Sequence, residues 1–460
     1  MPARAMRDDA SMASHPVRDH CLAPGREAEA ARGAGGYGRM FPDLPALRDG
    51  EDFFRARGRE AVAGAASPFV DRDPSGATTD AQGAAGWPVF AQFLAHDLTA
   101  DRSALASRAD VGTLRNARVA RLDLECVYGL GPAGQPYLVE RDDPARMLLG
   151  RNAADLPRNA EGVALIGDPR NDVHLPISQL HVAFLRAHNR FVDHLREDGA
   201  DDVFEEARRA LRWHLQWIVL HDYLPRLVGD ELAAQVRDGG RGWFHPTDPP
   251  SLPVEFADGA FRYGHSQVRN TYRLQPDGDP LALFPDLMGF RPVPAERVID
   301  WSQLFDLPGR PPAPQRAKAI DGRLVPALVR LPAQITGEVH EAEFRSLAVR
   351  DLQRGLATGL PSGEAVAAAI GVEPLTSDEV AVAGWEWETP LWYYVLKEAE
   401  LRAGGERLGP VGGTIVAEVL VGIVDHDPGS YRAVDPGWRP TIAGPGADAG
   451  LGDLLVFAAG

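Results

Sequence analysis

Two long stretches with a helical repeat of apolar residues constrain the fold of this chain most. In 175–195 the apolar side chains recur at spacings of three and four, which places them along one side of a helix. The stretch 202–227 has the same repeat, and only a few residues separate the two. Because so short a connection forces the chain to turn back, we predict two long helices that pack antiparallel.

Most of the remaining chain also has helical patterns. A helix is predicted to begin at Trp87. Pro88 is tolerated there because N–H groups in the first turn of a helix have no acceptor within the helix, so the N–H that proline lacks is not needed. Further helices are expected at 252–272, 344–355, 391–400 and 411–424. No run of alternating apolar and polar residues is long enough for a sizeable sheet. The sequence therefore predicts a mainly α fold with little β structure.

The charge balance excludes several classes of partner. The chain has 48 Lys and Arg residues against 65 Asp and Glu residues, a net charge of −17. Such an acidic surface repels nucleic-acid phosphates and anionic membranes, so we expect no nucleic-acid partner. No stretch approaches the roughly 20 apolar residues of a membrane span.

Cysteine usage and the N-terminal residues bear on location. With only Cys21 and Cys126, no disulfide framework can form, which suits a reducing compartment. The charged start of the chain is not followed by the apolar run of a secretory signal. We therefore expect a cytoplasmic protein, although export by a route without a signal stays open.

The 460 residues are enough for one large domain that buries a cofactor-sized core. Residues 1–36 are rich in Ala, Arg, Gly and Asp and contain almost no large apolar side chains. Such a composition cannot offset the entropy lost on ordering. We predict a disordered tail at 1–36 and a single domain at 37–460.

His265, in the stretch 260–266, is a candidate iron ligand. A neutral imidazole is a common ligand of haem iron, and its basicity depends on the group that accepts a hydrogen bond from its other ring nitrogen. A single histidine beside a glycine is more often an ordinary packed residue. Four other stretches contain residues suited to the same iron site and so support His265 as its ligand. They lie at 92–97, 123–129, 167–171 and 350–355.

Taken together, these motifs resemble the animal haem peroxidases of the peroxidase–cyclooxygenase superfamily, and among them the shorter bacterial members. The resemblance extends from about Tyr37 to the C-terminus. It implies a helical domain with haem buried between the central helices. It also implies an enzyme that reduces hydrogen peroxide and oxidises a small organic or anionic electron donor. The oligomeric state and the natural donor are not indicated.

The resemblance assigns three residues to the peroxide side of the haem. His96 corresponds to the base that moves a proton between the two peroxide oxygens, and Arg170 to a permanent positive charge that stabilises the developing negative charge. Gln92, one helical turn before His96, corresponds to the residue that holds water or a small anionic substrate. The alternatives are that Arg170 forms an ion pair near Asp172 and that Gln92 is merely packed or solvated.

On the other side of the haem, the resemblance makes His265 the iron ligand. Asp351 stands where the family has an asparagine that accepts a hydrogen bond from this histidine. An ionised acceptor gives the ligand more imidazolate character, so we expect a lower reduction potential, unless Asp351 faces an arginine instead. Arg262 and Arg354 correspond to arginines that bind haem propionates; either could instead form a surface ion pair.

The resemblance also implies a calcium site beside the helix that carries His96. Its carboxylates would come from Asp97, Asp123 and Glu125. Val119 and Glu125 occupy positions where the family often has threonine and serine ligands. This departure leaves full occupancy open, while the carboxylate cluster is still expected.

The haem should be ordinary haem b, held without a covalent bond. Mammalian members form esters through an aspartate and a glutamate, but here Ala95 and Val173 stand at those positions. His174 replaces the methionine that forms a sulfonium link in one member. We therefore expect a less oxidising haem than in the halide-oxidising members.

Two other functions are compatible with the motifs. A fatty-acid dioxygenase of the cyclooxygenase branch needs a tyrosine three residues before the iron-ligating histidine, where this chain has Arg262 and Tyr263 is one residue away. A weak haem-binding or redox-sensing protein would not require His96, Arg170 and Gln92 together. Both alternatives are therefore less favoured than a peroxidase.

Overall fold

In the computed structural model, the described residues are 36–63, 71–72, 79–100, 111, 114, 116–247, 250–444 and 448–460. The tail predicted at 1–36 lies outside them, except for Gly36, and so does Cys21. The other cysteine, Cys126, is buried and has a free thiol.

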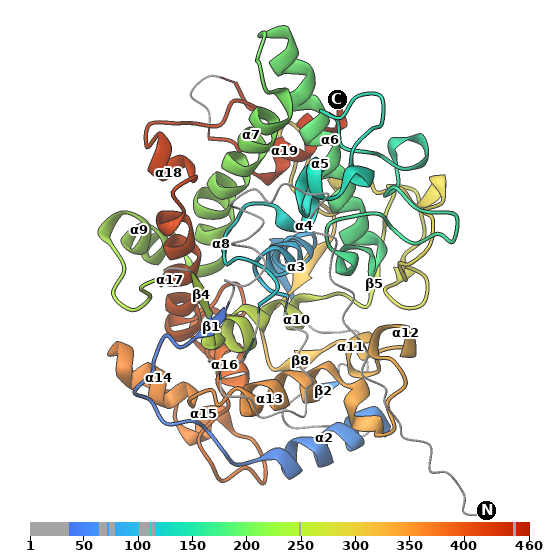
Figure 1. Cartoon of the computed structure of the whole chain (residues 1–460). Helices are drawn as coiled ribbons and strands as arrows, with labels where there is room; N and C mark the ends of the chain where they lie inside the picture. Colours follow the sequence, from blue (N-terminus) through green and yellow to red (C-terminus); the bar gives the residue numbers. More distant parts are fainter. Residues whose placement is uncertain are drawn as a thin grey trace, which may run out of the picture.

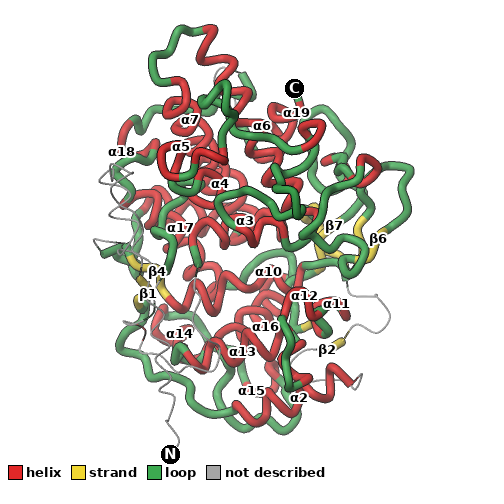
Figure 2. Tube along the Cα trace, turned by 45° about the vertical axis from the view of Figure 1, so that its right-hand side comes forward, coloured by secondary structure: helices red, strands yellow, loops and turns green. Residues whose placement is uncertain are grey.

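Helices dominate the described part of the chain, which confirms the predicted fold class (Figure 2). The longer ones are α2 (Glu51–Ala63), α3 (Trp87–Leu98), α6 (Leu175–Glu197), α7 (Val203–Ile218), α9 (Asp230–Gly239), α13 (Leu347–Ala357), α14 (Gly363–Ile370), α16 (Leu391–Ala403), α17 (Pro410–His426) and α19 (Leu451–Ala459). Shorter helices are α4 (Glu125–Tyr128), α5 (Gly131–Gly134), α8 (Leu224–Val228), α10 (Gly264–Gln267), α11 (Pro326–Val329), α12 (Ala333–Thr336), α15 (Ser377–Val380) and α18 (Tyr431–Val434).

The β structure consists of short pairs of strands that join distant parts of the chain. Two pairs are parallel: β1 (Gly36–Gly38) with β4 (Ser251–Pro253), and β2 (Asp71–Arg72) with β8 (Arg323–Leu324). Two are antiparallel: β3 (Asp80–Ala84) with β7 (Arg316–Lys318), and β5 (Thr271–Tyr272) with β6 (Leu281–Ala282). The described residues form no larger sheet, in agreement with the prediction.

The two long helices expected from the apolar repeats are α6 and α7, which pack against each other (Figure 1). The side chain of His174 accepts a hydrogen bond from the Ile177 N–H and caps the start of α6, and Asp202 caps α7. Such caps satisfy N–H groups that have no partner within the helix. Beyond α7 the chain continues through a π-helical turn, η6 (Val219–Tyr223), into α8.

Helix α3 lies at the centre of the molecule (Figure 1). It packs against α6 and against the short helix α10, which carries His265. Nine of its twelve residues are buried. Helices α16 and α17 complete the core beside the His265 segment, so α3 and α10 hold their side chains on a well-packed scaffold.

The segment around His265 differs from the continuous helix predicted at 252–272. After β4 come a π-helical turn, η7 (Glu255–Gly259), a 3₁₀ turn, η8 (Ala260–Tyr263), and then α10. Gly259 has a backbone conformation outside the helical region, with φ −119° and ψ −98°, so no regular helix passes through it. The extended residue Val268 ends α10. The prediction of one helix here was therefore wrong.

None of the described helices combines the length and apolar character needed to cross a membrane.

Candidate active site

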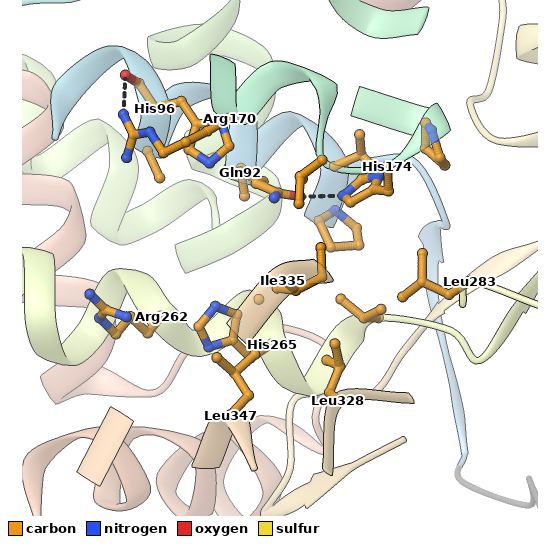
Figure 3. A pocket seen from close by; sticks show the side chains of 18 of the residues that line it. Gln92, His96, Arg170, His174, Arg262, His265, Leu283, Leu328, Ile335 and Leu347 are labelled. Atoms are coloured by element: carbon orange, nitrogen blue, oxygen red, sulfur yellow. Dashed lines mark hydrogen bonds between the residues drawn. The ribbon is translucent and has the colours of Figure 1, made fainter. Parts of the chain in front are cut away.

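A cavity of about 320 Å³, which we call the central cavity, lies between α3 and α10. Polar side chains stand on two of its sides (Figure 3). One side carries Gln92, His96, Arg170 and His174; the other carries Arg262 and His265. Apolar side chains, among them Leu283, Leu328, Ile335 and Leu347, line much of the remainder. The two histidines predicted to face one iron thus line the same cavity from different helices.

His96 is buried on α3, and its orientation is fixed by Asn171. The Nδ1 of His96 lies 2.7 Å from the Asn171 Oδ1, and the Asn171 Nδ2 lies 3.0 Å from the Nδ1 of His181. Because an amide oxygen only accepts hydrogen bonds, His96 carries its proton on Nδ1 and keeps a lone pair on Nε2. Burial, followed by the charge of Arg170, lowers the pKa of His96 to about 3. His96 is therefore a neutral base at pH 7.

The sequence motifs gave no indication that Asn171 and His181 would contact one another beside His96. Asn171 directly follows Arg170 in the 3₁₀ turn η5 (Pro169–Asp172), and both Asn171 and His181 are buried. No sequence spacing relates Asn171 to His96, which is 75 residues earlier. The His181 Nε2 has no hydrogen-bond partner among the described residues. The contact is therefore visible only in the folded chain.

Arg170 reaches the central cavity from η5, and its guanidinium is held by Asp168. Its Nε and Nη2 lie 3.1 and 2.7 Å from the carboxylate oxygens of Asp168, and Nη2 also donates to the His96 carbonyl at 3.1 Å (Figure 3). Burial alone would raise the pKa of Asp168, but the hydrogen bonds and charge of Arg170 outweigh it and hold that pKa well below its usual value. Asp172 pairs with Arg158 instead. The alternative pairing of Arg170 near Asp172 is thus not formed.

Gln92 lies one turn before His96 on α3 and lines the same cavity. Its Oε1 accepts a hydrogen bond from the His174 Nε2 at 2.7 Å (Figure 3). Since His174 also caps α6, this bond connects two of the helices around the cavity. Gln92 is therefore neither simply solvated nor packed against apolar neighbours.

His265 projects from α10, and its ring is held by Asp351 of α13. The His265 Nδ1 lies 2.6 Å from the Asp351 Oδ2. The other carboxylate oxygen of Asp351 accepts a hydrogen bond from Arg262 at 3.0 Å, and Arg262 also pairs with Asp258 at 3.0 Å. Asp351 is fully buried, so both partners are needed to satisfy its charge. With Nδ1 bonded to Asp351, the Nε2 of His265 is left for a metal.

The alternatives stated for Asp351 both apply, because it contacts the histidine and an arginine. Arg262 also pairs with Asp258, four residues earlier, a contact that was not predicted. Arg262 lines the central cavity, whereas Arg354 is absent from its described lining. Of the two arginines expected near the propionates, the structure therefore brings only Arg262 to the cavity.

The predicted calcium ligands lie close to α3 but are not arranged around one point. Asp97 accepts hydrogen bonds from the N–H groups of Leu124 and Cys126, both at 3.0 Å. Glu125 pairs with Arg118 at 2.8 Å. Burial, then the charge of Asp123, raises the pKa of Asp97 to about 7. Within the described ranges, no three His, Cys, Asp or Glu side chains form a group that could hold a metal ion.

Comparison with known proteins identifies the family of this chain. A family model described as animal haem peroxidase matches residues 106–378. The chain belongs to the animal haem peroxidase family. Members of this family bind haem, and the central cavity of this peroxidase-family chain is lined by His96 and His265, the two histidines predicted from the sequence.

Several relatives are similar over part of their length. Peroxidase skpo-1 of Caenorhabditis elegans is 27% identical over 290 residues, which cover 59% of this chain and 41% of the relative. Human lactoperoxidase is 33% identical over 129 residues, or 27% of this chain and 18% of the relative. This peroxidase-family chain thus spans less than half of the length of these curated relatives.

Two solved structures share the fold. Peroxidase A from Dictyostelium discoideum superposes with a TM-score of 0.60 at 16% identity, covering 87% of this chain and 88% of the other. A fatty acid alpha-dioxygenase from Arabidopsis thaliana also has a TM-score of 0.60, at 15% identity, covering 84% and 72%. Identities this low show a common fold and do not distinguish between the two activities.

The residues of the central cavity fit a haem. His265 offers Nε2 on one side, and the neutral His96 stands on the other. The apolar lining suits a porphyrin face, and Arg262 is a cation at the same cavity. Ala95 and Val173 also line the cavity, and neither carries a carboxylate that could form an ester.

Proposed function

We propose that this chain is a haem peroxidase that reduces hydrogen peroxide and oxidises small organic or anionic donors. The observation that supports it best is the pair of histidines on the central cavity. His96 is a neutral base with a fixed tautomer, and His265 is a potential iron ligand whose Nδ1 is bound by a buried carboxylate. The bound haem would supply the iron that exchanges electrons with peroxide and donor.

Each side chain has a distinct task in this proposal. His265 would hold the iron through Nε2, while Asp351 keeps the ring oriented and increases its basicity. The Nε2 of His96 would take the proton from one peroxide oxygen and return it to the other, which leaves as water. Arg170, fixed by Asp168, would stabilise the negative charge on the departing oxygen. Gln92 would hold a water or a small anion beside them.

We also propose haem b without a covalent link, since hydrocarbon side chains occupy both ester positions at the cavity. Extraction with acid and butanone should remove all the haem from the purified protein; haem left on the chain would contradict this proposal. Membership of the bacterial branch and a single domain at 37–460 are further proposals, supported by the motifs and by the family match within that range. The cytoplasmic location stays a prediction.

A calcium ion beside α3 is a weaker proposal. The buried carboxylate of Asp97 and the half-buried carboxylate of Asp123 support it, whereas the pairing of Glu125 with Arg118 argues against a full set of ligands. Metal analysis of the purified protein after dialysis against a calcium chelator and after return to calcium would test it. A content well below one ion per chain would contradict the proposal.

The dioxygenase alternative receives less support from the cavity. Tyr263 is not among the residues that line it; its hydroxyl lies 2.7 Å from that of Tyr223. Tyr272 does line the cavity, but its hydroxyl accepts a hydrogen bond from the Arg269 N–H, and burial raises its pKa to about 12. Oxygen uptake with a fatty acid such as linoleate would favour the alternative.

The decisive experiment is to mix haem-loaded protein with hydrogen peroxide and follow the Soret band. We expect a rapid spectral change that a phenolic donor reverses, and a much slower change in His96→Ala. A protein that remains colourless despite haem supply would overturn the proposal. A haem that does not react with peroxide would favour the haem-binding or redox-sensing alternative.

A further inference from the structure

A second cavity, which we call the outer pocket, lies on the other side of the segments that enclose the central cavity. Its volume is about 420 Å³. It is lined by the start of α3, by the turn between α7 and α8, and by the segment that leads to His265; the aromatic members of the lining are Trp87, Tyr223 and Tyr263.

Only one layer of residues separates the two cavities. In three places, consecutive residues line different cavities, the first lining the outer pocket and the second the central cavity. These pairs are Trp87 and Pro88, Tyr263 and Gly264, and Gln267 and Val268. The partition is therefore made from α3 and α10, the helices that carry His96 and His265.

Aromatic rings form a continuous path through this partition. The ring centroids of Trp87 and Tyr223 are 6.0 Å apart, and the hydroxyls of Tyr223 and Tyr263 are 2.7 Å apart. The ring of Tyr263 lies 6.3 Å from that of Phe261, which lines the central cavity. Tyr223 ends the π-helical turn η6, an irregularity often found at functional positions. The oxidisable side chains of Trp87, Tyr223 and Tyr263 thus extend from the outer pocket to within ring contact of Phe261, which lines the central cavity.

The lining of the outer pocket suits a planar aromatic ligand. Trp87 is partly exposed, and the guanidinium of Arg226 lies 5.1 Å from the centre of its ring. Exposed charges of both signs lie around the pocket, namely Arg226, Arg407, Asp230, Asp306 and Glu406. Opposite charges in this mixture attract neither strong anions nor strong cations, which favours a small phenol or aromatic amine.

We propose that the outer pocket is a binding site for phenolic or aromatic amine donors, and that Trp87, Tyr223 and Tyr263 conduct their electrons to the haem site. This inference rests on the proposed peroxidase function. Each phenol would lose one electron to the path and its hydroxyl proton to the solvent. Two phenols and one hydrogen peroxide then give two phenoxyl radicals and two waters, so atoms and electrons balance.

Binding can be tested without turnover by filling the outer pocket. A Cβ on Gly83, which lines the pocket, would meet only the Trp87 ring, at 3.9 Å, so Gly83→Phe adds a side chain without a backbone clash. Calorimetric titration of the haem-loaded protein with 2-methoxyphenol should show affinity weakened by about tenfold or more in this variant. The matched control is Gly239→Phe, at an exposed glycine with no atom near its Cβ position. Equal affinities in the wild type and Gly83→Phe would overturn the donor site.

The smaller variant Gly83→Leu provides a second filling in case Gly83→Phe does not fold. A loss of affinity in Gly83→Leu with an unchanged unfolding midpoint supports the site. Unchanged affinity in a folded Gly83→Leu opposes it.

The electron path can be tested by electron paramagnetic resonance. Protein frozen shortly after mixing with peroxide and no donor should show an aromatic radical, which Trp87→Phe decreases and Trp387→Phe leaves unchanged. Trp387 is a suitable control because it is 45% exposed and does not line the outer pocket. The same radical in Trp87→Phe as in the wild type would overturn the path. If the wild-type haem does not react with peroxide, the peroxidase proposal and the path both fail, while the calorimetric comparison still decides on donor binding.

Discussion

The Nδ1 of His265 lies 2.6 Å from the carboxylate of Asp351, which Arg262 also contacts at 3.0 Å. A carboxylate shared in this way donates less charge to the imidazole than an unpaired one would, but it remains a stronger acceptor than an amide. The properties of a bound haem should therefore depend on this group of three side chains.

Asp351→Asn should raise the reduction potential of the bound haem iron, since a neutral amide removes negative charge from beside the ligand. Potentiometric titration followed by absorbance would measure the change. Asp258→Asn is the matched control, because it removes the other partner of Arg262 and leaves the pair of His265 with Asp351 intact. A potential that stays constant or falls in Asp351→Asn would contradict the assigned role.

His96→Ala should slow the reaction of the haem with peroxide by about 10²- to 10⁴-fold, the usual contribution of a positioned acid–base group. Stopped-flow absorbance at pH 7 would measure this rate. Because burial lowers the pKa of His96 to about 3, the wild-type rate should stay nearly constant as the pH falls from 7 to about 4. A rate that falls through about pH 6.5, the ordinary pKa of histidine, would show that His96 is not the base or not buried.

In Asn171→Asp, the rate of reaction with peroxide should begin to fall at a higher pH than in the wild type. We call this fall at low pH the acid limb of the profile. A carboxylate beside the His96 Nδ1 favours the charged imidazole and therefore raises its pKa. Asn116→Asp is a control at another buried asparagine, which bonds the backbone of residues 98 and 100 and not a histidine. An acid limb that moves equally in both variants would indicate a general effect of charge.

Asn171→Ala should lower the free energy of unfolding by about 1–3 kcal/mol, because the buried Nδ1 atoms of His96 and His181 lose their partners. Denaturant unfolding would measure this loss. Asn171→Asp should recover part of it, since a carboxylate still accepts the hydrogen bond of His96. A free energy of unfolding in Asn171→Ala equal to that of the wild type would show that these two hydrogen bonds add nothing to stability.

His188 should make the protein less stable in acid. Burial lowers its pKa to about 4, and both ring nitrogens are bonded, to the Tyr128 hydroxyl and the Ala145 carbonyl. Between about pH 4 and 6.5 the unfolded chain binds more protons at this residue, so its contribution is complete above pH 6.5 and is lost as the pH falls toward 4.

The wild type should therefore lose up to about 1.4 kcal/mol per pH unit relative to His188→Gln within that window. Denaturant titrations at several pH values would measure the difference. His340→Gln, at an exposed histidine, should leave the pH dependence unchanged. Parallel curves for the wild type and His188→Gln would contradict a neutral buried His188.

Local sequence patterns were sufficient for much of the fold. The apolar repeats of α6 and α7 and Pro88 at the start of α3 each depend on residues within a few positions of one another. The prediction of a continuous helix through Gly259 was wrong because the local pattern contains no information on distant segments, and such segments pack closely against this residue. A Cβ at Gly259 would lie 3.1 Å from Leu391, for example.

For the candidate site, the sequence by itself determined which residue types were available: His96, Arg170, Gln92 and His265 could be identified from short motifs. Only the tertiary structure decided their partners. Asn171 orients His96 across 75 positions, and Asp351 is shared with Arg262 across 89. Arg118 forms an ion pair with Glu125, and Arg354 is not among the described residues that line the cavity. A motif specifies chemical groups along the chain, whereas hydrogen bonds, burial and charge pairing depend on distances that exist only after packing.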